Sequence, residues 1–200
     1  VESYWLHWGP AEQTAMVRDE LDQNFQNLTE WLLFGGIDFD FISESLLPTQ
    51  CEKGGAPLAV GHMNYVVILV PGCETLRAST MERLEAFAAA GGKLVFAGQI
   101  PTLVDARPST RPAELAAKCE CIPLSEGAVL KAAEPGRDVE IRNQSGSLTK
   151  NLLYQMRQDG EGRWLFICNA KEPYNKDTAR YQDLRIRVAG GWKPTLYQTM

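Results

Sequence analysis

Histidine is scarce in this sequence, and its scarcity limits the chemistry available to the chain. Only two histidines occur among the 200 residues, His7 and His62, and both precede Cys73. A cysteine nucleophile needs a neighbouring base or cation to lower its pKa, because an unassisted thiol stays mostly protonated at neutral pH. The histidines therefore leave few ways to activate a cysteine.

Clusters of basic residues and long apolar runs are also missing. The formal net charge is -5 at pH 7, and the lysines and arginines are scattered along the chain. Nucleic-acid-binding proteins present a basic face, and runs of basic residues mark contacts with anionic membranes. The longest apolar run, Tyr65–Val70, has the length of a strand and not of a membrane-spanning helix. We therefore expect no nucleic-acid partner and no membrane partner.

The cysteines do not form a recognisable framework. Five cysteines at irregular spacing disfavour a set of disulfides and favour a reducing compartment, so we expect a cytoplasmic protein. Cys119 and Cys121 would face the same side of a strand, but no second cysteine pair accompanies them. A structural zinc site needs four ligands. We therefore expect no metal site and no cofactor.

The first part of the chain alternates helical and strand patterns. Apolar residues from Met16 to Leu32 recur every three or four positions, which predicts an amphipathic helix over Ala11–Phe34. Ile37–Ile42 alternates apolar and acidic residues and predicts a strand. Tyr65–Val70 is continuously apolar and predicts a parallel strand that is buried on both faces.

The same alternation continues after Tyr65–Val70. "RASTMERLEAFAAAGG" predicts a second helix with Ser79 or Thr80 as its N-cap, and Lys93–Gly98 predicts the next strand. "TRPAELAAK" predicts a short helix and "CECIPL" a weaker strand. Strand–helix–strand units of this length favour a parallel sheet, so residues 1–135 are predicted to form an open α/β domain. We expect Ile37–Ile42, Tyr65–Val70 and Lys93–Gly98 to be neighbouring strands.

Residues 136–200 follow a different pattern, with short strands and no helices. "QDGEGR" predicts a hairpin between two of the strands. The region is predicted to be a small antiparallel β module, the start of a β-sandwich. Because the chain opens abruptly and its last strand has no closing turn, we expect a segment of a longer protein. The predicted strands are "DVEIRN", "NLLYQMRQ", "RWLFICNA", "DLRIRV" and "PTLYQT".

Candidate ligand-binding residues follow from the geometry of a parallel sheet. Ligands of open α/β sheets bind beyond the carboxyl ends of the strands, and a segment that immediately precedes a helix emerges at the same edge. Aromatic side chains combined with acids and amides suit a polar ligand such as a sugar. In the alternative reading, the tryptophans cover a sheet edge and the acids cap a helix or face solvent. The candidates are Trp5, His7, Trp8, Glu44, Glu74 and Gln99.

Three stretches carry a resemblance to a known family. "LTEWLLFGGIDFDFISESLL", "YVVILVPGCETL" and "MERLEAFAAAGGKLVFAG" resemble the class I glutamine-amidotransferase-like domain embedded in large glycoside hydrolases. Such domains include the trimerisation domain of certain β-galactosidases, and similar segments occur in α-L-rhamnosidase-like enzymes. The resemblance covers about Trp5 to Leu124, and more loosely the strands that follow. It implies a flavodoxin-like three-layer sandwich, followed by a β module, with the catalytic barrel elsewhere in the protein.

The resemblance also bears on catalysis. In active amidotransferases the nucleophilic cysteine occupies a strand-to-helix elbow, with a histidine and an acid farther along the chain. The strand that corresponds to the elbow ends here in "FAGQIPT", so Gln99 stands at the nucleophile position and Cys73 lies one strand too early. No histidine follows Cys73. Asp38, Asp40, Glu44 and Glu74 supply carboxyl groups, but the resemblance places glycoside hydrolysis in a different domain.

The expected function is that of a non-catalytic accessory or oligomerisation module of a bacterial glycoside hydrolase. The expected partners are the catalytic barrel of the same protein, a second copy of the chain and carbohydrate. One alternative is an active amidotransferase-like hydrolase that uses Cys73. The other is a stand-alone carbohydrate-binding module that uses Trp5 and Trp8.

Overall fold

The computed structural model describes residues 2–160, 162–170 and 183–197 and divides the chain into two compact units. The first contains Val1–Leu32 and Phe39–Gly136, and the second contains Leu33–Asp38 and Arg137–Met200. The sequence places the boundary after residue 135, one position before the boundary in the structure. The short segment Leu33–Asp38, although it precedes most of the first unit in the sequence, belongs to the second unit. None of the described helices combines the length and apolar character needed to cross a membrane.

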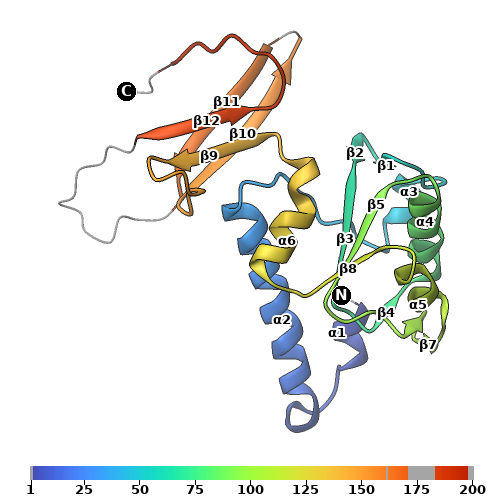
Figure 1. Ribbon diagram of the computed structural model, residues 1–200. Helices are drawn as coiled ribbons and strands as arrows, with labels where there is room; N and C mark the ends of the chain where they lie inside the picture. The colour runs from blue at the N-terminus through green and yellow to red at the C-terminus, as the bar shows by residue number, and fades with distance from the viewer. Residues whose placement is uncertain (1, 161, 171–182, 198–200) are drawn as a thin grey trace. The chain divides into compact units, whose positions relative to one another are not determined.

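A parallel sheet lies at the centre of the first unit (Figure 1). Its strands are β3 (Val67–Pro71), β5 (Lys93–Ala97) and β8 (Glu120–Ile122), paired in parallel in the order β3-β5-β8. The prediction of an α/β fold with a parallel sheet is confirmed, and so are the strands predicted around β5 and β8. The central strand, β5, is buried from its second residue to its last.

Helices pack on the sheet and complete the core of the first unit. In Figure 1, α4 (Ala78–Ala89) and α5 (Arg111–Ala116) lie on one side of the strands, and α6 (Glu126–Ala133) lies on the other. A short 3-10 helix, η1 (Glu134–Gly136), follows α6. The α4 side chains Met81, Leu84 and Phe87 are buried in the same cluster as Phe96 of β5. Both predicted helices in this region, α4 and α5, are confirmed.

Helix α2 (Ala11–Phe34) has the bounds that its periodicity predicts, but it does not bury its whole apolar stripe. Leu28 and Leu32 are buried in its last turns. Met16 and Phe25, in contrast, have exposed fractions of 82% and 53%. The periodicity therefore identifies the helix correctly and overstates how much of it lies against the core.

The prediction of a strand at Ile37–Ile42 is wrong. The segment pairs with no described strand, and the division between the two units falls inside it, between Asp38 and Phe39. Its aromatic rings instead form a small cluster with α2. The ring centroids of Phe25 and Phe41 are 4.7 Å apart, and Phe39 meets Phe41 edge-on at 5.4 Å.

Because Ile37–Ile42 forms no strand, it does not pair with β3 as predicted. In the described part of the chain β3 is the edge strand of its sheet. The predicted burial of Tyr65–Val70 on both faces is wrong, because only alternate residues of β3 are buried. Ile68 and Val70 are buried, whereas Val67 and Leu69 on the other face are only partly covered. The continuous apolar sequence therefore corresponds to a strand that has one buried face and one partly buried face.

Short elements fill the remainder of the first unit. β1 (Leu58–Val60) and β2 (Met63–Tyr65) form an antiparallel hairpin after α3 (Leu47–Gln50). A second small sheet joins β4 (Thr75–Leu76) in parallel to β6 (Leu103–Val104), and β6 pairs antiparallel with β7 (Arg107–Pro108). Helix α1 (Glu2–Leu6) packs near β4. These pieces position the candidate site.

The second unit is an antiparallel β structure. β9 pairs with β12, and β10 pairs with β11 from Leu152–Asn169 to Asp159–Gly162, which confirms the predicted hairpin. A small core gathers around Val139, Ile141 and Leu152. The strand predicted at "PTLYQT" is wrong as far as residue 197, and its last two residues lie outside the described part of the chain. The strands are β9 (Val139–Asn143), β10 (Leu152–Asp159), β11 (Gly162–Asn169) and β12 (Leu184–Val188).

Candidate functional site

The carboxyl ends of β3 and β5 form one edge of the parallel sheet, the rim. Gly72, Cys73 and Glu74 follow β3, and Gln99 lies just beyond β5. The two tips are close together, because a Cβ atom added to Gly72 would lie 3.2 Å from the backbone nitrogen of Gln99. Glycine at position 72 therefore allows the tips to approach each other.

Helix α1 is hydrogen-bonded to this rim through a buried serine. The Oγ atom of Ser3 accepts hydrogen bonds from the backbone N–H of Glu74 at 2.9 Å and of Thr75 at 3.2 Å. Ser3 is only 5% exposed. Two adjacent backbone donors aimed at one oxygen are a common way to bind a polar or anionic ligand group. In this structure both donors bind the side chain of Ser3.

Two further side-chain contacts reinforce the same attachment. Nε2 of His7 lies 2.6 Å from Oε1 of Glu74, and Nε of Arg77 donates to Oε1 of Glu2 at 2.8 Å. Burial opposes ionisation of Glu2, but hydrogen bonds from its own backbone and from Arg77 outweigh this effect and lower its pKa. The structure therefore brings two of the predicted residues, His7 and Glu74, into direct contact.

Glu44 caps a helix. Its Oε2 atom accepts a hydrogen bond from the backbone N–H of Arg77 at 2.8 Å, and Oδ1 of Asp105 accepts one from Ala78 at 3.0 Å. Arg77 is the N-cap of α4 and makes no capping hydrogen bond with its own side chain. The predicted N-cap at Ser79 or Thr80 is therefore wrong, because acids from distant segments satisfy the first donors of the helix.

Cys73 lies half-buried in an environment that opposes ionisation. Burial, together with the negative charges of Glu44 and Glu74, raises the pKa of the Cys73 thiol from 9.0 to about 12. A thiolate is the nucleophilic form of cysteine. At neutral pH the thiol of Cys73 is therefore almost wholly protonated.

The remaining predicted residues are dispersed. Trp5 is 70% exposed and Trp8 is 76% exposed. The ring of Trp8 faces Arg18 of α2, whose guanidinium carbon lies 5.8 Å from the ring centroid. Gln99 is exposed. Neither of the two cavities described below is lined by all six predicted residues.

A shallow cleft does lie beside α1 in the first unit. Its volume is about 300 Å³. Sequence reasoning found Trp5 alone among its lining residues, because the others come from small elements without a periodic pattern. Asp105, at the start of the two-residue connection between β6 and β7, is the one residue whose type indicates its local structure. Aspartate tolerates the backbone conformation of a tight hairpin turn. The lining residues are Glu2, Trp5, Leu6, Thr75, Leu76, Arg77, Asp105 and Ala106.

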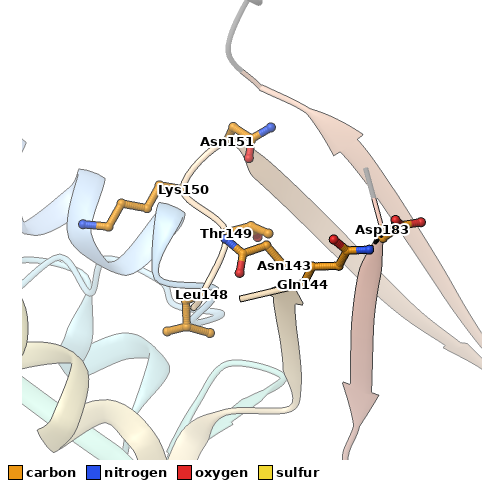
Figure 2. Close-up of a pocket in the computed structure, with 7 residues that line it drawn as sticks. All are labelled: Asn143, Gln144, Leu148, Thr149, Lys150, Asn151 and Asp183. Carbon is orange, nitrogen blue, oxygen red and sulfur yellow. Dashed lines mark hydrogen bonds between the residues drawn. The ribbon is translucent and has the colours of Figure 1, made fainter. Parts of the chain in front are cut away.

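A larger and more polar hollow lies in the second unit (Figure 2). Several of its polar groups are hydrogen-bonded within the second unit. Gln144 donates to Asp183 at 2.7 Å, the amide of Asn151 donates to Asn169 at 2.7 Å, and Thr149 donates to a backbone carbonyl. Among the described residues, no aromatic side chain lines this hollow, whereas Trp5 lines the cleft beside α1.

Within the described residues, no group of three or more histidine, cysteine, aspartate or glutamate side chains is arranged to hold a metal ion. Comparisons of the chain with protein-family models, curated proteins and solved structures find no match. The geometry of the rim and of the cleft therefore carries the functional argument.

Proposed function

We propose that the chain is a non-catalytic accessory or oligomerisation module of a large glycoside hydrolase. In this proposal the first unit is a class I amidotransferase-like, flavodoxin-like domain and the second is the start of a β-sandwich. Hydrolysis of carbohydrate takes place in a catalytic barrel that the two units support. The similarity of the three sequence stretches quoted above and the parallel order of β3, β5 and β8 support this assignment.

The attachment of α1 to the rim is the observation that carries the non-catalytic part of the proposal. A substrate at the carboxyl end of β3 could bind the backbone donors of Glu74 and Thr75 only if Ser3 released them. Glu2 and His7 fix the same helix through Arg77 and Glu74. An internal contact therefore occupies two of the backbone donors that follow β3, near the edge of the sheet where ligands of open α/β domains bind.

The chemistry of Cys73 weighs against the rival enzyme. An amidotransferase-like hydrolase needs a thiolate and a base, and the two nearest acids raise the pKa of this thiol instead of lowering it. The one histidine at the rim, His7, is engaged by Glu74. A hydrolase that uses Cys73 would first have to release α1 and rearrange both acids.

An activity assay with matched variants tests the proposal. The purified chain is incubated with glutamine and with nitrophenyl β-galactoside and α-L-rhamnoside, beside Cys73→Ala and Glu44→Gln. We expect no turnover above that of Cys73→Ala for any substrate. Turnover that either substitution abolishes would contradict the proposal.

Sedimentation velocity over a concentration series tests which supporting role applies. A concentration-dependent dimer or trimer would support the oligomerisation role. A monomer at every concentration would exclude self-association and leave support of the catalytic barrel as the role of the module.

A further inference from the structure

The cleft beside α1 has one apolar side that is largely open to solvent. The indole of Trp5 is 70% exposed and Leu6 is 41% exposed, although both are large apolar side chains. Leu76 and Ala106 are the other apolar residues that line the cleft. A ligand that fits here must present an apolar face, because only such a face gains from covering the indole.

The lining of the cleft also includes charged side chains, one basic and two acidic. Arg77 contributes one positive charge and is paired with Glu2 at 2.8 Å, while Asp105 contributes a further carboxylate. A phosphate group would meet the two carboxylates, and an organic cation would meet the guanidinium of Arg77. A neutral ligand with several hydroxyl groups can donate to the carboxylates and accept from the guanidinium.

The backbone of the turn that carries Asp105 is strained. Asp105 and Ala106 have φ angles of 50° and 58°, a left-handed conformation that is costly for an alanine. Hydrogen bonds to the neighbouring strand β4 hold the turn in place. The N–H of Ala106 donates to Oγ1 of Thr75 at 3.1 Å, and the N–H of Asp105 donates to the carbonyl of Leu76 at 2.9 Å.

This strain has a structural effect at the cleft. The turn places the Asp105 carboxylate at the N-terminus of α4, where Oδ1 accepts from Ala78 at 3.0 Å. Strained residues that the surrounding structure holds in place cluster at ligand-binding sites, where they orient a side chain in advance. The position of Asp105 is therefore fixed before any ligand arrives.

We propose that the cleft between α1 and the β6–β7 turn binds a neutral pyranose sugar. One C–H face of the ring stacks on Trp5, and its hydroxyl groups hydrogen-bond Arg77 and Asp105. The inference rests on the chemistry of the cleft and goes beyond the proposed function, because an accessory module can support a catalytic domain without binding sugar. In this proposal the acid that contacts the sugar is Asp105, in the turn after β6, and not the rim acids Glu44 and Glu74.

NMR titration of the whole chain tests this site. The indole N–H signal of Trp5, assigned by its loss in Trp5→Ala, is followed as D-galactose, D-glucose and L-rhamnose are each added up to about 50 mM. We expect a saturable shift with at least one sugar and a dissociation constant on the order of millimolar. Because Trp5 is mostly exposed, Trp5→Ala is expected to keep the fold, which the remaining indole signals report.

Matched variants separate the cleft from the rest of the aromatic segment. Trp5→Ala should weaken sugar binding at least about tenfold, since it removes the stacking surface. Asp105→Asn, which tolerates the same backbone, should weaken it by a smaller factor. Trp8→Ala should leave binding unchanged, because Trp8 faces Arg18 and does not line the cleft.

Three results would overturn the assignment. The first is the absence of a saturable shift with all three sugars. The second is binding that survives Trp5→Ala. The third is an equal or stronger response to tetramethylammonium or inorganic phosphate, which would assign the cleft to a charged ligand. None of these results bears on the activity assay above, so the sugar site and the accessory role can fail separately.

Discussion

We expect Cys73 to be alkylated slowly because of its surroundings. A rise in pKa from 9.0 to about 12 lowers the thiolate fraction at neutral pH by about a thousandfold. The intrinsic nucleophilicity of a thiolate rises with its pKa, with a Brønsted slope of about 0.4–0.5, and this recovers a factor of about 16–32. The net expectation is that Cys73 reacts about 30–60 times more slowly than an ordinary thiol, before any steric protection.

Iodoacetamide labelling followed by peptide mass spectrometry measures this ratio within one molecule. The exposed thiols of Cys121 and Cys168 serve as internal references. The labelling rate of Cys73 should keep rising with pH up to about 11, because its thiolate fraction is still far from complete there. Glu44→Gln should speed the labelling of Cys73, since it removes a charge that raises the thiol pKa.

Two findings would refute this reasoning. One is labelling of Cys73 as fast as that of Cys168 at pH 7.5. The other is a rate that levels off below pH 9, which would place the thiol pKa in the range of an activated nucleophile. Either finding would restore the hydrolase alternative.

Two further predictions concern the packing of the first unit, and urea denaturation measures both. Gly92→Ala should destabilise the protein by about 1–3 kcal/mol, because the new Cβ would lie 2.3 Å from the buried ring of Phe87. Gly127→Ala, on an open helix face, should be neutral or stabilising by up to about 1 kcal/mol, and equal losses for both would contradict the account. Ser3→Ala should cost about 1–3 kcal/mol by leaving two backbone donors unpaired, whereas the exposed Ser45→Ala should cost almost nothing.

Local sequence patterns predict α2, α4, α5 and the longer strands of this chain, but they miss α1, α6 and the β1–β2 hairpin. The three-to-four-residue periodicity of α2 and α4 and the β-rich stretches of β5, β10 and β11 depend on neighbouring residues alone. The pattern fails at Ile37–Ile42, because alternation of apolar and acidic residues does not distinguish a strand from an extended connection. Its aromatic side chains pack on α2 without strand pairing.

The candidate site is less predictable because distant segments build it. The strand order predicts that His7 and Glu74 approach the same edge of the sheet, and the structure places them in contact. In contrast, no local signal reveals that Ser3 binds the rim or that Asp105 caps α4. These contacts join residues far apart in the chain, and short elements such as α1 and the β6–β7 turn carry no periodicity.

Amide hydrogen exchange at the rim tests the central claim, that Ser3 of α1 occupies the backbone donors that follow β3. The backbone amides of Glu74 and Thr75 donate to Ser3, so both should be protected from exchange in the wild-type protein. In Ser3→Ala their exchange should be at least about tenfold faster, while β5 amides keep their protection. Exchange of both amides at the rate of an unstructured chain in the wild-type protein would show that Ser3 does not occupy these donors, and would contradict the account.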